Sequence, residues 1–126
     1  MHELSIAVSV LDVAAEEAER LGVDVVAIRL KLGPLSGVVA EALRSAFELA
    51  REASPLPQAR LDIEQVPIII YCHTCQAERP AASLQQIRCA SCGAPAADVV
   101  TGRELEVVGL EVVDRLPDAA ASGRGG

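Results

Sequence analysis

The residues best suited to chemistry are four cysteines arranged in two pairs. Two residues lie between Cys72 and Cys75 and between Cys89 and Cys92, and thirteen residues separate the pairs. Such spacing lets a tight turn aim two sulfurs and several backbone amides at one metal ion. Four thiolates at about 2.3 Å fill the tetrahedral shell of Zn²⁺ and leave no position for water or substrate. The pattern predicts a closed, structural zinc site, and Gly93 suits a positive φ after its last ligand.

Other uses of these thiols fit the sequence less well. Two tight pairs in a chain expected to be cytoplasmic favour metal over disulfides. A thioredoxin-like redox site needs a pair at the start of a helix, whereas both pairs stand in loop-like sequence. A zinc deaminase needs an open coordination position and an H-x-E segment, which the sequence lacks. We interpret His73 as an exposed neighbour of the first pair, and a role in tuning the site is a hypothesis.

A second candidate metal site is the N-terminal Met1-His2-Glu3. The terminal amine, the amide and imidazole of His2, and the amide of Glu3 can close fused chelate rings around one ion. An all-nitrogen planar set favours Ni(II), or Cu(II) in competition. A solvated histidine ahead of a helix is the other interpretation, and these residues alone leave it open.

Composition limits the partners. The chain of 126 residues has a net charge of −7, so it offers no electrostatic footprint for nucleic acid or an anionic membrane. No apolar run approaches the roughly 18 residues of a membrane span, and no signal peptide is visible. Aromatic residues are 2%, so the core must be aliphatic and rich in alanine. We expect a soluble, cytoplasmic protein.

Five elements must position these residues. Apolar periodicity predicts helices over 4–21 and 38–53, with Gly22 ending the first. Alternation predicts strands over 26–32, 61–64 and 104–113. The apolar faces are expected at Leu4, Val8, Leu11 and Ala15 in the first helix, and at Val39, Leu43, Phe47 and Ala50 in the second.

The order of these elements predicts the fold class. A strand, a helix and a strand in succession favour two parallel neighbouring strands, and Gly109 predicts a bulge in the last strand. We expect an α+β fold with two helices on a three-stranded mixed sheet and an inserted four-cysteine, zinc-ribbon-like lobe. The predicted domains are 1–67 with 103–116, the lobe at 68–102, and a flexible tail at 117–126.

Several motifs occur in an order that is specific to one family. MHELS opens the chain, LGPLSGV follows the first predicted strand, AFELA lies in the second helix, and the C-x2-C pairs precede a Gly-x-Glu-Leu strand. Over residues 1–113 this set resembles the HypA family (HypA/HybF), the nickel metallochaperones of [NiFe]-hydrogenase maturation.

The resemblance implies a nickel site at Met1, His2 and Glu3, and a structural zinc site at the four cysteines. It also implies two partners, the GTPase HypB and the hydrogenase large-subunit precursor, and some family members serve urease. Where some members have an acidic nickel ligand this chain has Val39, and the nearest acid is Glu41.

Two other functions fit the sequence, a zinc-ribbon interaction module without metal delivery and a thiol redox switch. With His2 and His73 as the only histidines, we expect no enzyme activity. For a metallochaperone, the first helix beside His2 is the expected partner surface.

Overall fold

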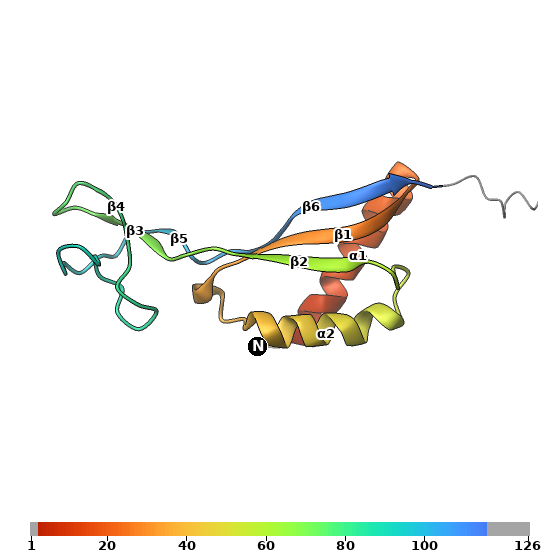
Figure 1. Ribbon diagram of the computed structural model, residues 1–126, viewed down its shortest axis with the longest axis horizontal. Coiled ribbons are helices and arrows are strands. Elements are labelled where there is room, and N and C mark those ends of the chain that lie inside the picture. Colours follow the sequence, from red (N-terminus) through yellow and green to blue (C-terminus); the bar gives the residue numbers. More distant parts are fainter. Residues whose placement is uncertain (1–2, 116–126) are drawn as a thin grey trace, which may run out of the picture.

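The computed structural model describes residues 3–115, which form two helices, one 3-10 turn and six strands (Figure 1). The helices are α1 (Glu3–Leu21) and α2 (Ala40–Glu52), and the turn is η1 (Pro34–Ser36). The strands are β1 (Val23–Leu32), β2 (Arg60–Gln65), β3 (Ile69–Cys72), β4 (Ala77–Pro80), β5 (Val99–Thr101) and β6 (Leu105–Asp114). The predicted flexible tail at 117–126 lies outside the described residues.

The main sheet has the strand order β2-β1-β6. β1 runs parallel to β2 and antiparallel to β6, so the sheet is mixed. The strand–helix–strand order therefore does place β1 and β2 side by side, and the predicted α+β fold is confirmed. β1 begins at Val23, three residues before the predicted start, because its pairing with β6 reaches Asp114. A long-range partner of this kind leaves no trace in local alternation.

The last strand carries the bulge that was predicted near Gly109. Arg29 pairs with Gly109 and Leu30 pairs with Val107, so Val108 is the extra residue on β6. A second bulge lies in β1, where Val26 is skipped between the pairs of Val25 and Ala27. Each bulge shifts the alternation of side chains by one position.

Both helices contribute to a core on one face of the main sheet. Leu11 of α1, Leu43 and Phe47 of α2, and Ile28 and Leu30 of β1 are almost completely buried there. Phe47 is the only phenylalanine of the chain, and small residues fill much of the rest, as the composition predicts.

The predicted apolar face of α1 was partly wrong. Leu4 is 48% exposed and Val8 is 44% exposed, whereas Ala7, Val10 and Ala14 are buried. The buried face of α1 must pack on α2 as well as on the sheet, and alanines allow that close approach. The larger side chains of Leu4 and Val8 lie at the margin of this face.

The start of α2 also differs from the prediction. The helix begins at Ala40, not at Val38, because Gly37 in a left-handed conformation (φ 82°) ends the η1 turn and Val39 becomes the N-cap. Val38 is consequently buried, whereas Val39 is 62% exposed. Ser36 accepts a hydrogen bond from the Val38 amide at 3.2 Å and lies before the helix without capping it.

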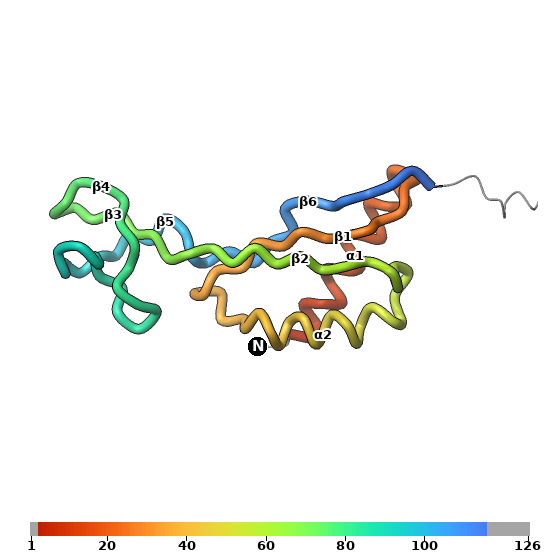
Figure 2. Tube along the Cα trace, viewed as in Figure 1, coloured from red at the N-terminus to blue at the C-terminus, as the bar shows by residue number. Residues whose placement is uncertain are grey.

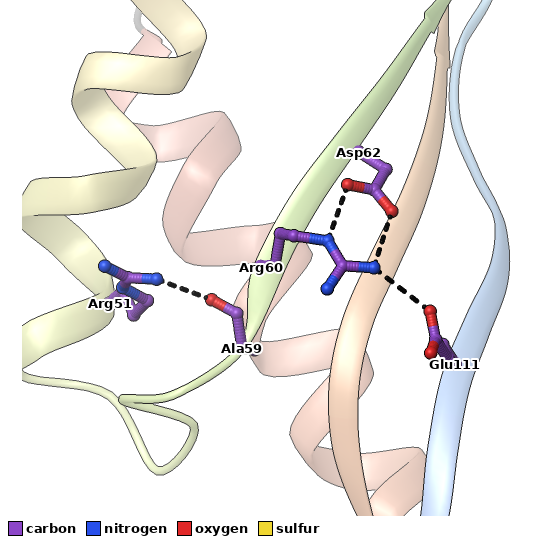
Figure 3. A network of polar contacts seen from close by, with 5 residues as sticks. All are labelled: Arg51, Ala59, Arg60, Asp62 and Glu111. Atoms are coloured by element: carbon purple, nitrogen blue, oxygen red, sulfur yellow. Dashed lines mark hydrogen bonds and ion pairs between the residues drawn. The ribbon is translucent and has the colours of Figure 1, made fainter.

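The other face of the main sheet is polar. Arg60 on β2 donates to both carboxylate oxygens of Asp62 at 2.9 and 3.2 Å, and to Glu111 on β6 at 3.1 Å (Figure 3). Arg60 and Glu111 are the two cross-strand neighbours of Ala27, so their ion pair spans β1 and leaves Ala27 fully buried. Hydrogen bonding from Arg60 holds the pKa of Asp62 below its usual value.

A second sheet, with the order β4-β3-β5, contains the cysteine segment. The trace in Figure 2 shows this part extending beyond one end of the main sheet. It has a small core of its own, in which Ile70, Cys72 and Cys89 are buried. The predicted domain boundaries at 67/68 and 102/103 stay predictions.

The chain crosses itself tightly at the junction between the two sheets. The Gly33 amide donates to the Glu104 carbonyl at 2.8 Å, and the Leu35 amide donates to the Gly102 carbonyl at 2.7 Å. A Cβ atom on Gly33 would lie 2.1 Å from the Gly102 oxygen. Gly33, the first glycine of the LGPLSG segment, is therefore required for the close approach of the two backbone segments.

No helix within residues 3–115 is both long and apolar enough to cross a membrane.

Candidate metal centres

The four cysteine sulfurs converge on one point. All four Sγ atoms lie within 4.8 Å of one another, with Cys72 3.6 Å from Cys92 and Cys75 3.9 Å from Cys89. Sulfurs in a tetrahedron about 2.3 Å from one Zn²⁺ lie about 3.8 Å apart. The donor set and its spacing therefore fit a zinc ion that uses all four thiolates, as a closed structural site does.

The two cysteine pairs share one local geometry. The Cys75 amide donates to the Cys72 sulfur at 3.4 Å, and the Cys92 amide donates to the Cys89 sulfur at 3.5 Å. These bonds offset the negative charge of the thiolates. Such a turn needs a left-handed residue directly after its second cysteine, which is Gly93 (φ 78°) in one pair, as predicted.

The equivalent residue of the first pair is Gln76, with φ 56°. It is the only non-glycine residue with positive φ in residues 3–115. The positive φ of Gln76 was not predicted, although its place directly after the first cysteine pair matches that of Gly93 after the second.

The cysteines differ in their electrostatic surroundings. A hydrogen bond from the Cys92 amide, helped by the Ser91 amide, lowers the pKa of the Cys89 thiol to about 6. The Ala94 amide favours the Cys92 thiolate, but the Cys72 sulfur, burial and the other two sulfurs outweigh it and raise the pKa of Cys92 to about 11. Four adjacent thiols cannot all ionise without a cation, and a divalent ion removes that repulsion.

His73 does not belong to the cysteine cluster. Its side chain is 77% exposed, and its Nε2 atom lies 2.6 Å from a carboxylate oxygen of Asp98. Its ring also packs edge-on against Tyr71, with the ring centroids 4.9 Å apart. This placement agrees with the interpretation of His73 as an exposed neighbour of the first pair, and the tuning role stays a hypothesis.

The second candidate metal site falls mostly outside the described residues. Met1 and His2 are not described, so the structure does not bring the three predicted nickel ligands together. Glu3 is half-buried and is the first residue of α1. Glu41 is exposed in the first turn of α2 and, within residues 3–115, joins no cluster of metal-binding side chains.

The fold and the cysteine cluster together define a class, an α+β protein with a second sheet built around a four-cysteine zinc site. Comparison with known proteins narrows the class to a family. The sequence profile of the HypA family, "Hydrogenase/urease nickel incorporation, metallochaperone, hypA", matches residues 1–112. The chain therefore belongs to the HypA family of nickel metallochaperones.

Relatives match nearly the whole chain. The hydrogenase maturation factor HypA of Roseiflexus sp. (strain RS-1) is 45% identical over 123 residues, which is 97% of this chain and 100% of the relative. The protein of the same name from Thermomicrobium roseum is 41% identical over 128 aligned positions, 89% of this chain and 98% of the relative.

A solved structure agrees with the fold. The solution structure of the Ni metallochaperone HypA from Helicobacter pylori superimposes with a TM-score of 0.63 at 25% identity. The superposition covers 91% of this chain and 100% of the other. The predicted resemblance to the HypA family is confirmed.

Proposed function

We propose that this chain binds Ni(II) through the Met1 amine, the amide and imidazole of His2, and the amide of Glu3. In this proposal it hands the ion to the [NiFe]-hydrogenase large-subunit precursor, together with the GTPase HypB, in the cytoplasm. Urease maturation proteins are a second possible destination. Membership of the family, whose profile matches from residue 1, carries this proposal.

The cysteine cluster supports the proposal because it leaves no open coordination position on a bound metal ion. A cargo ion must exchange with a partner, and exchange needs a coordination position that an incoming ligand can reach. Four convergent thiolates with two buried members, Cys72 and Cys89, offer no such position. The exchangeable metal therefore belongs elsewhere, and the zinc holds the second sheet together.

The N-terminal nitrogens have the chemistry of a releasable site. The imidazole and the amine bind nickel only when unprotonated, so a fall in pH weakens binding and favours release. Glu3 begins α1, where the helix dipole favours a negative charge and opposes a cation. Its carboxylate partly neutralises that opposition. A carrier of moderate affinity can pass its metal on, whereas a thermodynamic trap cannot.

Nickel titration of the zinc-loaded chain with its native N-terminus tests the proposal. His2→Ala removes the imidazole, and we expect nickel affinity to fall by at least about a hundredfold, since lost metal ligands have large effects. His73→Ala is the matched control, because it removes the other histidine, which is exposed beside the zinc cluster. It should leave nickel affinity unchanged.

A second variant tests the terminal amine. Two residues added ahead of Met1 keep the His2 side chain but move the amine away, and nickel binding should weaken as strongly as in His2→Ala. Equal nickel binding by the native chain, His2→Ala and the extended chain would remove the N-terminal site from the proposal.

A further inference from the structure

The last strand of the main sheet has a free edge. In the order β2-β1-β6, β6 pairs with β1 on one side only, and within residues 3–115 no other strand pairs with its outer side. The outer edge of β6 therefore carries backbone N–H and C=O groups that an added strand could bond. At ten residues β6 is long for an edge strand.

An apolar groove runs beside this edge. It has a volume of about 330 Å³ and lies between α1 and β6 on the helix face of the sheet. Ile6, Val10 and Val13 line it from α1 together with Ser5 and Ser9. Leu105, Glu106 and Val107 line it from β6, and Leu30 lines it from β1. Val13 is 49% exposed, so part of this apolar surface faces solvent. A strand added to β6 would direct every second side chain into this groove.

The opposite face of the same edge carries two glutamates, of which Glu106 is the cross-strand neighbour of Lys31. Glu106 alternates with Leu105 and Val107, so its side chain belongs to the polar face of the sheet, where Glu111 meets Arg60. Both glutamates are exposed. A strand added along Leu105–Val107 would place its other side chains next to the Glu106 carboxylate, and a positive charge there is favoured.

We propose that the edge of β6 is a docking site for an extended segment of a partner protein in which aliphatic and basic residues alternate. The segment adds a fourth strand to the main sheet along Leu105–Val107, its aliphatic side chains enter the groove under α1, and its lysine or arginine lies beside Glu106. Backbone hydrogen bonds provide the affinity, while the groove and the Glu106 carboxylate select the sequence.

A second copy of the chain fits this edge poorly. Pairing of β6 with another β6 would bring Glu106 and Glu111 of both copies onto one face of a shared seam, where like charges repel. The net charge of −7 on each copy adds to this repulsion. The bulge at Val108 restricts regular pairing to one side of it, and the groove places the docked segment along Leu105–Val107.

The probe for the first experiment is a capped octapeptide that alternates valine with lysine. Its counterpart alternates valine with glutamate. Each is titrated into the full, zinc-loaded chain while backbone amide resonances are followed. We expect the lysine peptide to bind and to shift the amides of Leu105–Val107 and of Ile6–Val13, and the glutamate peptide to leave them unchanged.

Matched charge variants test the position. Glu106 and Glu64 are both exposed, and both are cross-strand neighbours of Lys31, but they lie on opposite edges of the sheet. Glu106→Lys should weaken lysine-peptide binding by about threefold or more, because it turns an attraction into a repulsion. Glu64→Lys changes the net charge equally and should leave the affinity within experimental error.

Matched apolar variants test the groove. Val13→Asp should weaken binding by a similar factor, whereas Leu49→Asp should not, because Leu49 is exposed on α2 and lines a different groove. Neither glutamate variant touches the N-terminus, so nickel affinity stays unchanged in both. Failure of the docking site and failure of the nickel site are therefore distinguishable.

Several results would overturn the docking site. These are equal binding of the two peptides, no binding of either, equal weakening by Glu106→Lys and Glu64→Lys, or shifts confined to residues away from β6 and α1. A chain ending at Arg115 that binds far more tightly than the full chain would assign the edge to residues 116–126. A dimer that Glu106→Lys strengthens would assign it to a second copy.

Discussion

At the scale of single residues, the cysteines of the cluster differ in their burial and in the pKa of their thiols. Cys89 is buried in the small core of the second sheet and has a low thiol pKa, about 6, whereas Cys92 is exposed and has a pKa of about 11. Cys89 is therefore both a packing residue and the thiol that gives up its proton more readily than Cys92. Cys92 must lose a proton when zinc binds.

Loss of Cys89 should abolish stable zinc binding. Cys89→Ser leaves three thiolates and a poor hydroxyl ligand, so we expect the purified chain to hold well under one zinc per chain after dialysis against a mild chelator. Ser91→Ala alters an exposed residue of the same turn and serves as the control, with zinc retained. Measurement of the zinc content per chain after dialysis distinguishes the two variants. Full zinc retention by Cys89→Ser would contradict the four-thiolate site.

Gly33 should tolerate no side chain. Gly33→Ala places a Cβ 2.1 Å from the Gly102 oxygen, and the chain crossing at the sheet junction must separate. Loss of the two backbone hydrogen bonds there should lower the free energy of unfolding by about 2–4 kcal/mol. Gly109→Ala is the control, since nothing lies within 4 Å of its Cβ. Urea denaturation measures both, and equal stabilities would disprove the steric role.

The metal-binding residues could be predicted from the sequence. The residues that a special backbone conformation or a close backbone contact requires could be predicted only in part. The spacing of the four cysteines predicts the zinc site, and the position of Gly93 after the last cysteine predicts its positive φ. Gly33 was noted only as part of the LGPLSGV motif after the first predicted strand, because its close contact with Gly102 joins segments about seventy residues apart. Contacts of this kind depend on the whole fold and leave no local pattern.

At the scale of elements, periodicity found both helices and the three strands of the main sheet, but it placed the buried faces less well. A helix that packs on both a sheet and another helix buries a wide face, and the deepest positions of α1 are alanines. The three strands of the second sheet are only three or four residues long, too short for an alternating pattern to be recognised in the sequence. Metal ligation and tight turns determine them instead.

Phe47 should be the most costly side chain to remove from α2. It is 1% exposed in the core between the helices and the sheet. Phe47→Ala removes most of a large buried side chain and should lower the free energy of unfolding by about 3–5 kcal/mol. Leu49→Ala, in the same helix at a site 66% exposed, should cost less than about 0.5 kcal/mol. Urea titrations that gave equal losses would place the core elsewhere.

At the scale of the whole molecule, the two sheets have separate cores of very different strength. The core of the main sheet draws on α1, α2, β1 and β2, whereas two of the three buried residues of the other core are cysteines. A core so small gives the second sheet too little stability to fold alone, and binding of the zinc ion provides the additional stability. The two parts meet at the Gly33 crossing, and Leu84 of the cysteine segment lines a groove there with Val38 and Val39.

Removal of zinc should therefore unfold one part and spare the other. With a strong chelator present, amide resonances of Ile69–Thr101 should collapse toward unfolded positions and exchange with solvent rapidly. Those of α1, α2 and β1 should keep their positions, since their core contains no metal ligand. Helical circular dichroism should change little for the same reason. Readdition of zinc should restore the lost resonances, because structural zinc binding and folding are one process. One cooperative collapse of both sets of resonances would show instead that the cysteine cluster stabilises the whole chain.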